Sequence, residues 1–84
     1  MEYYKILVNR INEFCQMRNL STRALAKMCG LSRTSISNII QGKSKNPRIQ
    51  TLHRIATGLN MTLSEFLDIK ELNEYEFESK EDDE

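Results

Sequence analysis

The sequence predicts an all-α domain of five short helices. Apolar residues recur at helical spacing in five stretches, three of which begin at a Ser or Thr with matching apolar neighbours. No alternating strand pattern occurs before residue 73. A chain of 84 residues makes one small domain with a single modest core. We expect the folded domain to span residues 1–70 and an acidic tail to span residues 71–84.

The first helix is expected over residues 3–18. Its apolar face consists of Tyr4, Leu7, Val8, Ile11, Phe14 and Cys15. Asn19 follows, and Asn tolerates the left-handed conformation that often closes a helix. The second helix is expected over residues 22–28, and Gly30 can supply the positive φ of a tight turn into the third helix at residues 33–41.

Three helix starts share one arrangement, in which Ser21, Ser32 and Thr62 can each act as an N-cap. Each cap follows an apolar residue and precedes another apolar residue by four positions, which is a hydrophobic staple. Glu65 lies three residues after Thr62 and can complete a capping box. These patterns fix the starts of the second, third and fifth helices.

A polar loop, KSKNPR at residues 43–48, separates the third helix from the fourth. Pro47 restricts the backbone there and pushes the preceding residue towards an extended conformation. The fourth helix is expected over residues 49–58, Asn60 is a second candidate for a left-handed C-cap, and the fifth helix is expected over residues 63–69.

The formal net charge of zero hides a strong asymmetry along the chain. Residues 14–64 contain eight basic residues and no acid, whereas residues 65–84 contain ten acids and two lysines. We call residues 14–64 the basic block. A folded segment with this charge indicates a polyanionic partner.

The third helix has two chemically different faces. Ile36, Ile39 and Ile40 share one face, and Thr34 and Asn38 lie on another. Neutral donors and acceptors opposite a buried face are suited to reading the edges of DNA bases.

The run STRALAKMCGLSRTSISNIIQGKSKNPRIQTLHRIATGLNMTLSEFLD resembles the five-helix DNA-binding domain of the phage repressor and Cro family, the XRE-type helix-turn-helix proteins. The resemblance covers residues 12–68 and includes the small Ala26, the turn at Gly30, the GKSKNP loop and the MTLSEFL end. It implies that the third helix enters the major groove while the second crosses the DNA backbone.

The resemblance also implies two sets of contacts. Base contacts would come from Arg33, Thr34, Ser35 and Asn38, although Arg33 fits a phosphate contact equally well. Phosphate contacts would come from Thr22, Arg23, Lys43, Lys45, Asn46 and Arg48. The free N–H groups at the start of the second helix and the basic loop support that second set.

Two positions depart from the family pattern. Thr22 stands where many members have a Gln that bonds a phosphate and steadies the reading helix. Cys15 and Ile40 stand where some members have a buried Arg–Glu pair, and apolar replacement of such a pair is often neutral or stabilising. We therefore expect a secure fold with fewer contacts that orient the third helix on DNA.

We expect a sequence-specific, double-stranded DNA-binding transcriptional regulator, most simply a repressor that binds a two-fold operator as a dimer. The alternative is an antitoxin or protein-interaction module that uses the acidic, aromatic tail, with DNA binding secondary. The polar face of the third helix favours DNA. The N-terminus does not resemble a signal peptide and no apolar run approaches about 18 residues, so we expect a cytoplasmic protein without a membrane partner.

No enzymatic activity, cofactor or metal is expected. The single histidine, His53, has no nucleophile or acid pair near it in the sequence. Cys15 and Cys29 lack zinc-ligand spacing, so we interpret them as buried reduced thiols, with a disulfide or metal site as the less favoured alternative.

The acidic tail has two interpretations. Its composition is typical of disordered segments, whereas the alternation of acids and aromatics at residues 74–78 fits a short strand. A strand or helix extension could pack on a partner subunit. The tail charge could also compete with DNA for the basic face within a Debye length of roughly 8–10 Å.

Overall fold

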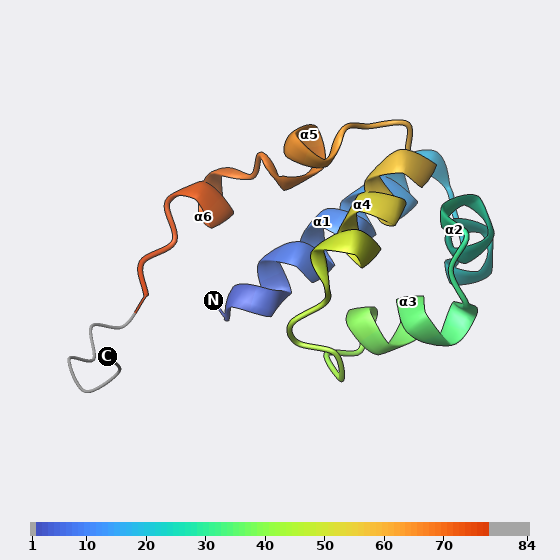
Figure 1. Ribbon diagram of the computed structural model, residues 1–84, viewed down its shortest axis with the longest axis horizontal. Helices are drawn as coiled ribbons and strands as arrows, with labels where there is room; N and C mark the ends of the chain where they lie inside the picture. The colour runs from blue at the N-terminus through green and yellow to red at the C-terminus, as the bar shows by residue number, and fades with distance from the viewer. Residues whose placement is uncertain (1, 78–84) are drawn as a thin grey trace.

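The computed structural model describes residues 2–77. The helices in that range are α1 (Tyr3–Arg18), α2 (Thr22–Cys29), α3 (Arg33–Ile40), α4 (Ile49–Gly58), α5 (Leu63–Leu67) and α6 (Lys70–Asn73). The chain forms no strand between residues 2 and 77, so the all-α prediction is confirmed. The molecule is 43 Å long, with α2 and α3 at one end and α6 at the other (Figure 1).

The three predicted N-caps are confirmed by side-chain hydrogen bonds. Ser21 Oγ accepts from the backbone N–H of Ala24 at 3.1 Å, and Ser32 Oγ accepts from that of Ser35 at 3.0 Å. Thr62 Oγ1 accepts from the Glu65 N–H at 3.1 Å, and Glu65 Oε1 accepts from the Thr62 N–H at 2.9 Å. The last pair of bonds is the predicted capping box. The α2, α3 and α5 helices therefore begin directly after the predicted caps.

The predicted chain reversals are also confirmed. Asn19 and Asn60 adopt φ values of 55° and 65°, in the left-handed region, and Gly30 adopts 68° between α2 and α3. These residues close α1, α4 and α2 without continuing the helices, because a left-handed residue redirects the chain and lets its N–H groups return to the last turn.

The core gathers side chains from α1 to α5 and the short connections between them. Its buried members are Leu7, Ile11, Leu25, Ala26, Cys29, Ile36, Ile39, Leu52, Ile55, Ala56, Leu59 and Phe66. The α2 helix packs against both α3 and α4, and α4 packs against α5. Gly58 permits the close approach of α2 and α4, since a Cβ at this position would lie 2.7 Å from Cys29 Sγ.

The predicted face of α1 was incomplete. Ile6 is buried in the structure, whereas Tyr4 and Val8 are only half-buried. Cys29 is buried as predicted, but Cys15 is half-buried, and both thiols are free. Burial raises the pKa of Cys29 to about 11, with a further contribution from Cys15, so this thiol stays protonated and unreactive at neutral pH.

Two arginines of α1 fasten the C-terminal helices. Arg10 donates through Nε to the Phe66 carbonyl at 2.9 Å and through Nη2 to the Glu65 carbonyl at 2.8 Å. Arg18 donates to the Leu59 carbonyl at 2.8 Å. These bonds supply partners to carbonyls at the ends of α4 and α5, where the intrahelical pattern runs out; the Glu65 carbonyl also accepts from the Asp68 N–H. Arg18, although part of the basic block, therefore has a structural role.

Helix boundaries differ from the predicted ones by one or two residues. The fifth helix ends at Leu67 rather than residue 69, because Asp68 leaves helical geometry with ψ of 78° and Ile69 is extended. The α2 helix includes Cys29, and α3 ends at Ile40. The structure also adds a sixth helix, α6, that the sequence pattern did not predict.

The segment after α6 returns to the start of α1 in the same chain. Tyr75 and Phe77 lie with their ring centroids 4.9 Å and 5.5 Å from that of Tyr3, and we call these three residues the aromatic cluster. The strand interpretation of residues 74–78 is wrong for its described part, residues 74–77, which are a turn followed by coil. Residues 78–84 lie outside the described range, and the domain boundary after residue 70 stays a prediction.

None of the helices in residues 2–77 combines the length and apolar character needed to cross a bilayer.

Candidate nucleic-acid interface

The α3 helix buries its apolar face in the core and directs its polar residues away from it. Ile36 and Ile39 are buried in the core, whereas Arg33 and Thr34 are exposed and Asn38 is half-buried. The Ser32 cap fixes where the helix begins, and the buried isoleucines fix its rotation. Thr34 and Asn38 therefore occupy one turn-to-turn stripe that faces away from the core.

Ser35 differs from the other predicted base contacts. Its Oγ lies 2.9 Å from Ser32 Oγ, and its backbone N–H donates to the same Ser32 oxygen. The Ser35 hydroxyl is therefore already engaged in the cap of α3. Any bond between Ser35 and a base would share or replace this contact.

The loop after α3 is folded back onto the end of that helix. The Asn38 carbonyl accepts hydrogen bonds from the backbone N–H groups of Lys43 at 2.9 Å and Ser44 at 3.0 Å. Next to these bonds lies a shallow hollow whose lining includes Asn38, Asn46 and Arg48. Ser35 lines the same hollow, so the structure brings two predicted base contacts beside two predicted phosphate contacts.

A second shallow hollow lies at the start of α2. Its lining consists of Ser21, Thr22, Arg23 and Arg33. The predicted phosphate residues of α2 are therefore adjacent to Arg33 of α3, ten positions away in the sequence. This hollow combines two guanidinium groups with the positive end of a helix, and that is the chemistry of an oxyanion site.

The start of α4 adds a group that the sequence analysis missed. Arg48 occupies the N-cap position, and within residues 2–77 no side chain caps this helix. Its first N–H groups therefore have no intrahelical partner and point out of the helix beside the basic loop. The absence of Ser, Thr, Asp or Asn directly before Ile49 could have revealed this open end.

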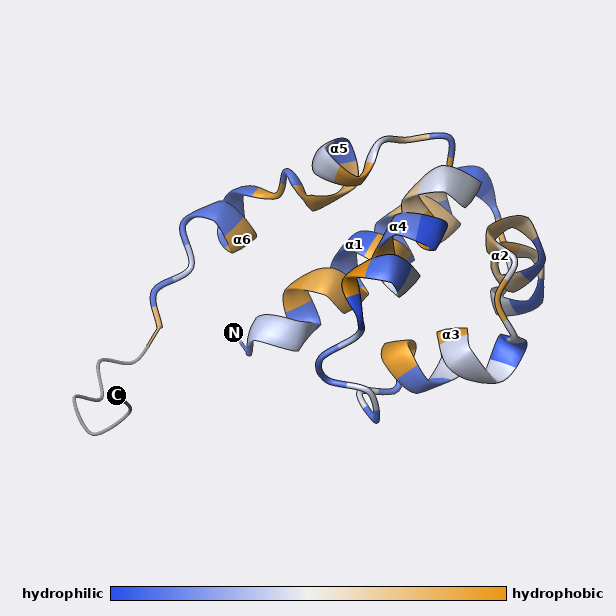
Figure 2. Ribbon diagram, viewed as in Figure 1, coloured by the Kyte–Doolittle hydropathy of each residue, from blue (hydrophilic) through white to orange (hydrophobic). Residues whose placement is uncertain are grey.

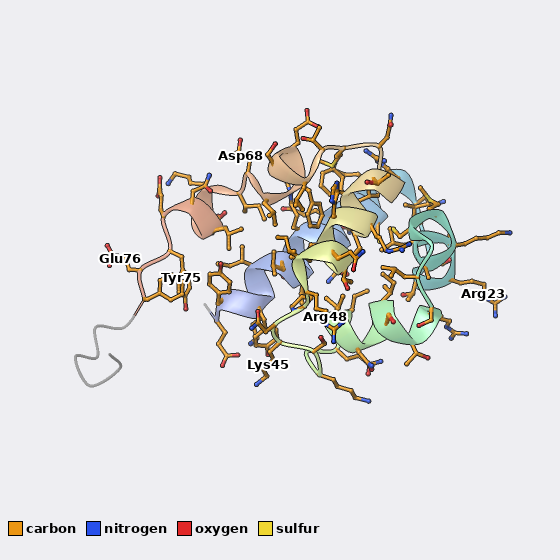
Figure 3. The ribbon with its side chains drawn as sticks, viewed as in Figure 1. Arg23, Lys45, Arg48, Asp68, Tyr75 and Glu76 are labelled. Atoms are coloured by element: carbon orange, nitrogen blue, oxygen red, sulfur yellow. The ribbon has the colours of Figure 1, made fainter. Side chains whose placement is uncertain are left out.

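The basic side chains of this surface are not neutralised by neighbouring acids. Among residues 2–77, the ion pair formed is Lys70–Glu74 at 3.3 Å, on α6. Figure 3 shows Arg23, Lys45 and Arg48 on the side of α2, α3 and their following loop, while Asp68, Tyr75 and Glu76 lie on the opposite side. The connection from α3 to α4 is hydrophilic over most of its length (Figure 2). The result is a surface of unpaired positive charge around α3.

The positions that depart from the family pattern are packed with apolar side chains. Cys15 and Ile40 are half-buried against the core. Both positions therefore make apolar contacts with the core in place of an ion pair. The described residues contain no group of three or more His, Cys, Asp or Glu side chains that could hold a metal ion.

Comparisons with known proteins agree with this arrangement. The sequence matches the model of the Cro/C1-type helix-turn-helix DNA-binding domain over residues 10–76. The fold is similar to the crystal structure of an HTH_3 family transcriptional regulator from Vibrio cholerae, with a TM-score of 0.69 and 32% sequence identity. That match covers 77% of this chain and 36% of the other, so this chain spans little more than a third of that regulator.

No curated protein sequence matches the chain. The helix-turn-helix of α2 and α3, the caps that define it and the family match over residues 10–76 lead to one conclusion. The chain belongs to the Cro/C1-type helix-turn-helix DNA-binding family.

Proposed function

We propose that this protein is a sequence-specific regulator of transcription, a repressor that binds a two-fold operator in double-stranded DNA as a dimer. One observation carries the proposal: polar residues of α3 line two hollows that also contain predicted phosphate contacts. Arg33 shares one with Thr22 and Arg23 at the start of α2. Asn38 shares the other with Asn46 and Arg48 at the loop before α4. In this arrangement α3 enters the major groove, and the two hollows meet the DNA backbone on either side.

Base reading falls to the polar stripe of α3. Asn38 can form paired hydrogen bonds with N6 and N7 of an adenine, and such a pair contributes about 1–3 kcal/mol of discrimination. Thr34 can offer its methyl group to a thymine or its hydroxyl to a base edge. Ser35 contributes less, because its hydroxyl is already bonded to Ser32.

Arg33 is proposed as a phosphate contact rather than a guanine contact. It shares a hollow with Thr22 and Arg23, and that hollow lies at the N-terminus of α2. Phosphate contacts position a protein on the duplex without reading its sequence. The remaining members of the proposed phosphate set are Lys43, Lys45, Asn46 and Arg48, all of which precede α4.

Dimerisation is proposed because a single small domain covers only one half-site. Two half-sites lie about 34–36 Å apart, one turn of DNA, when a two-fold dimer binds one face. We propose α5 and the segment after it as the dimer surface. Phe77 is 72% exposed in the single chain, which supports that choice.

A second candidate is a protein-interaction module, such as an antitoxin, in which DNA binding is secondary. The aromatic cluster favours it, because exposed aromatic side chains at a chain end can serve as anchors for a partner. Under either function we expect a cytoplasmic protein with no catalytic activity, cofactor or membrane partner.

Capture of genomic fragments by the purified chain tests the proposal. We expect recovery of a small set of fragments that share a palindromic sequence, and a solution mass that corresponds to a dimer. Recovery of random fragments would contradict sequence-specific repression. Stable association with one protein and no fragment enrichment would support the interaction module instead.

A further inference from the structure

Tyr4, in the first turn of α1, lies against the loop that follows α3. The contact is seen at Gly42, where a Cβ would stand 2.9 Å from Tyr4 Cε2 and 3.3 Å from Tyr4 Oη. Gly42 also adopts a φ of 77°, which side chains rarely tolerate. The ring and the glycine therefore fit together, and 38 positions of sequence separate them.

The same ring meets a predicted phosphate contact. Lys45 Nζ lies 5.2 Å from the centroid of the Tyr4 ring, within the range of a cation–π interaction. Lys45 is exposed and forms no ion pair with an acid among residues 2–77. The aromatic face thus restricts a long, flexible side chain that would otherwise sample many rotamers.

The backbone of the loop is held from its other side by α3. The Asn38 carbonyl accepts from Lys43 and Ser44, as described above. Tyr4 and the end of α3 therefore bracket the turn at residues 42–44, and Lys45 is the first long side chain after it. Holding a side chain in its bound geometry raises affinity by reducing the ordering cost of binding.

We propose that Tyr4 is a positioning residue for the DNA backbone: its ring supports the loop at Gly42 and holds Lys45 where a phosphate can meet it. This inference rests on the proposed DNA-binding function. It assigns a role to α1, on which the family resemblance implied no DNA contact. The effect acts through Lys45 and is independent of base sequence.

Binding of Tyr4→Leu to a specific and a random duplex, each over a series of salt concentrations, tests the inference. We expect affinity for both duplexes to fall by about 3-fold, because the ring that restrains Lys45 is lost. We also expect the slope of log affinity against log salt to decrease by up to about 0.9, the value of one phosphate contact. Tyr4→Phe, which keeps the ring, should restore both quantities.

Val8→Ala is the matched control. Val8 lies one turn after Tyr4 on α1 and is also half-buried, and it belongs to neither the proposed DNA contacts nor the proposed dimer surface. Its substitution should lower the stability of α1 while leaving the salt slope unchanged. Tyr4→Met, which fills the half-buried site with a flexible apolar chain, is measured in parallel so that one poorly folded variant does not decide the result.

The double variant Tyr4→Leu/Lys45→Ala shows whether Tyr4 acts through Lys45. We expect it to bind no more weakly than Lys45→Ala alone, which is a non-additive outcome. A normal salt slope in folded Tyr4→Leu and Tyr4→Met, or additive losses in the double variant, would overturn the inference. If Lys45→Ala itself has no effect, the proposed phosphate contact fails. If Lys45→Ala weakens binding and Tyr4→Leu does not, only the role of Tyr4 fails.

Discussion

The two ends of this molecule differ in how their charged side chains are arranged. The end that we propose as the DNA-facing end, formed by α2, α3 and the loop before α4, keeps its cations exposed and away from acids. The C-terminal end is formed by α5, α6 and the aromatic cluster. It contains the acids of residues 65–77, and Lys70 forms an ion pair with Glu74 there. Figure 1 shows α2 and α3 at one end and α6 at the other, with α1 and α4 between them, while the loop before α4 lies towards the start of α1.

This difference implies that the C-terminal end mainly affects the free energy of unfolding, whereas the other end mainly affects the affinity for DNA. At the C-terminal end, Phe66 is fully buried and the Arg10 bonds fix the carbonyls beside it. At the DNA-facing end, the residues proposed to bind DNA lie outside the core, and few of their side chains are bonded within the chain. Substitutions at the first end should therefore change folding, whereas substitutions at the second should change binding.

Phe66→Ala should cost about 3–5 kcal/mol of unfolding free energy, since it removes a fully buried aromatic side chain and leaves a cavity. Urea denaturation followed by circular dichroism measures this loss. A domain of this size has little stability to spare, so partial unfolding at 37 °C is expected. A loss below about 1 kcal/mol would show that α5 is not part of the cooperative core.

Asn38→Ala should remove about 1–3 kcal/mol of discrimination at one base position while leaving the unfolding free energy nearly unchanged. Competition binding with operator variants at that position measures the discrimination. Lys45→Ala is the matched contrast and should weaken all duplexes alike. Equal loss of specificity in the two variants would contradict the assignment of roles.

Ser21→Ala and Thr62→Ala compare equivalent caps at the two ends. Each should lower the unfolding free energy by about 1 kcal/mol, because each removes a side-chain acceptor for a helix N–H. Only Ser21→Ala should also weaken DNA binding, since Ser21 lines the hollow with Arg23 and Arg33. Thermal unfolding and fluorescence anisotropy measure the two quantities. Equal losses of DNA affinity in the two variants would show that the effect of Ser21→Ala on binding comes from lowered stability alone.

Truncation after Phe77 should raise affinity for random DNA a few-fold at low salt, with no effect above about 0.15 M salt. The truncation removes five acids and one lysine while it retains the aromatic cluster. The change is small because interactions between exposed charges in water are weak and are screened by salt. A gain that persists at high salt would point to direct contact instead.

The local parts of the fold could be predicted from sequence, and the long-range contacts could not. Ser21, Ser32 and Thr62 lie beside the helices that they cap, so their role is visible in a few residues. The α6 helix has only four residues with Leu72 as its one apolar member, which is too short for a helical period to appear. Its formation depends on packing against α1.

The same limit applies to the candidate site. The faces of α3 follow from helical spacing, and the family resemblance indicated the basic loop. The pairing of Arg33 with Thr22 and Arg23 depends on how α2 and α3 pack. The contact of Tyr4 with Gly42 joins α1 to a loop 38 positions later, and the engagement of Ser35 by Ser32 depends on side-chain rotamers.

In the proposed function, an unpaired basic surface around α3 binds a specific DNA sequence. Gel shifts with DNA from upstream of the protein's own gene and with a random duplex, each at two salt concentrations, test this binding. We predict tighter binding to the upstream DNA and a steep loss with salt, at about 0.9 in log–log slope for each phosphate contacted. Absence of DNA binding even at low salt would contradict the proposed function.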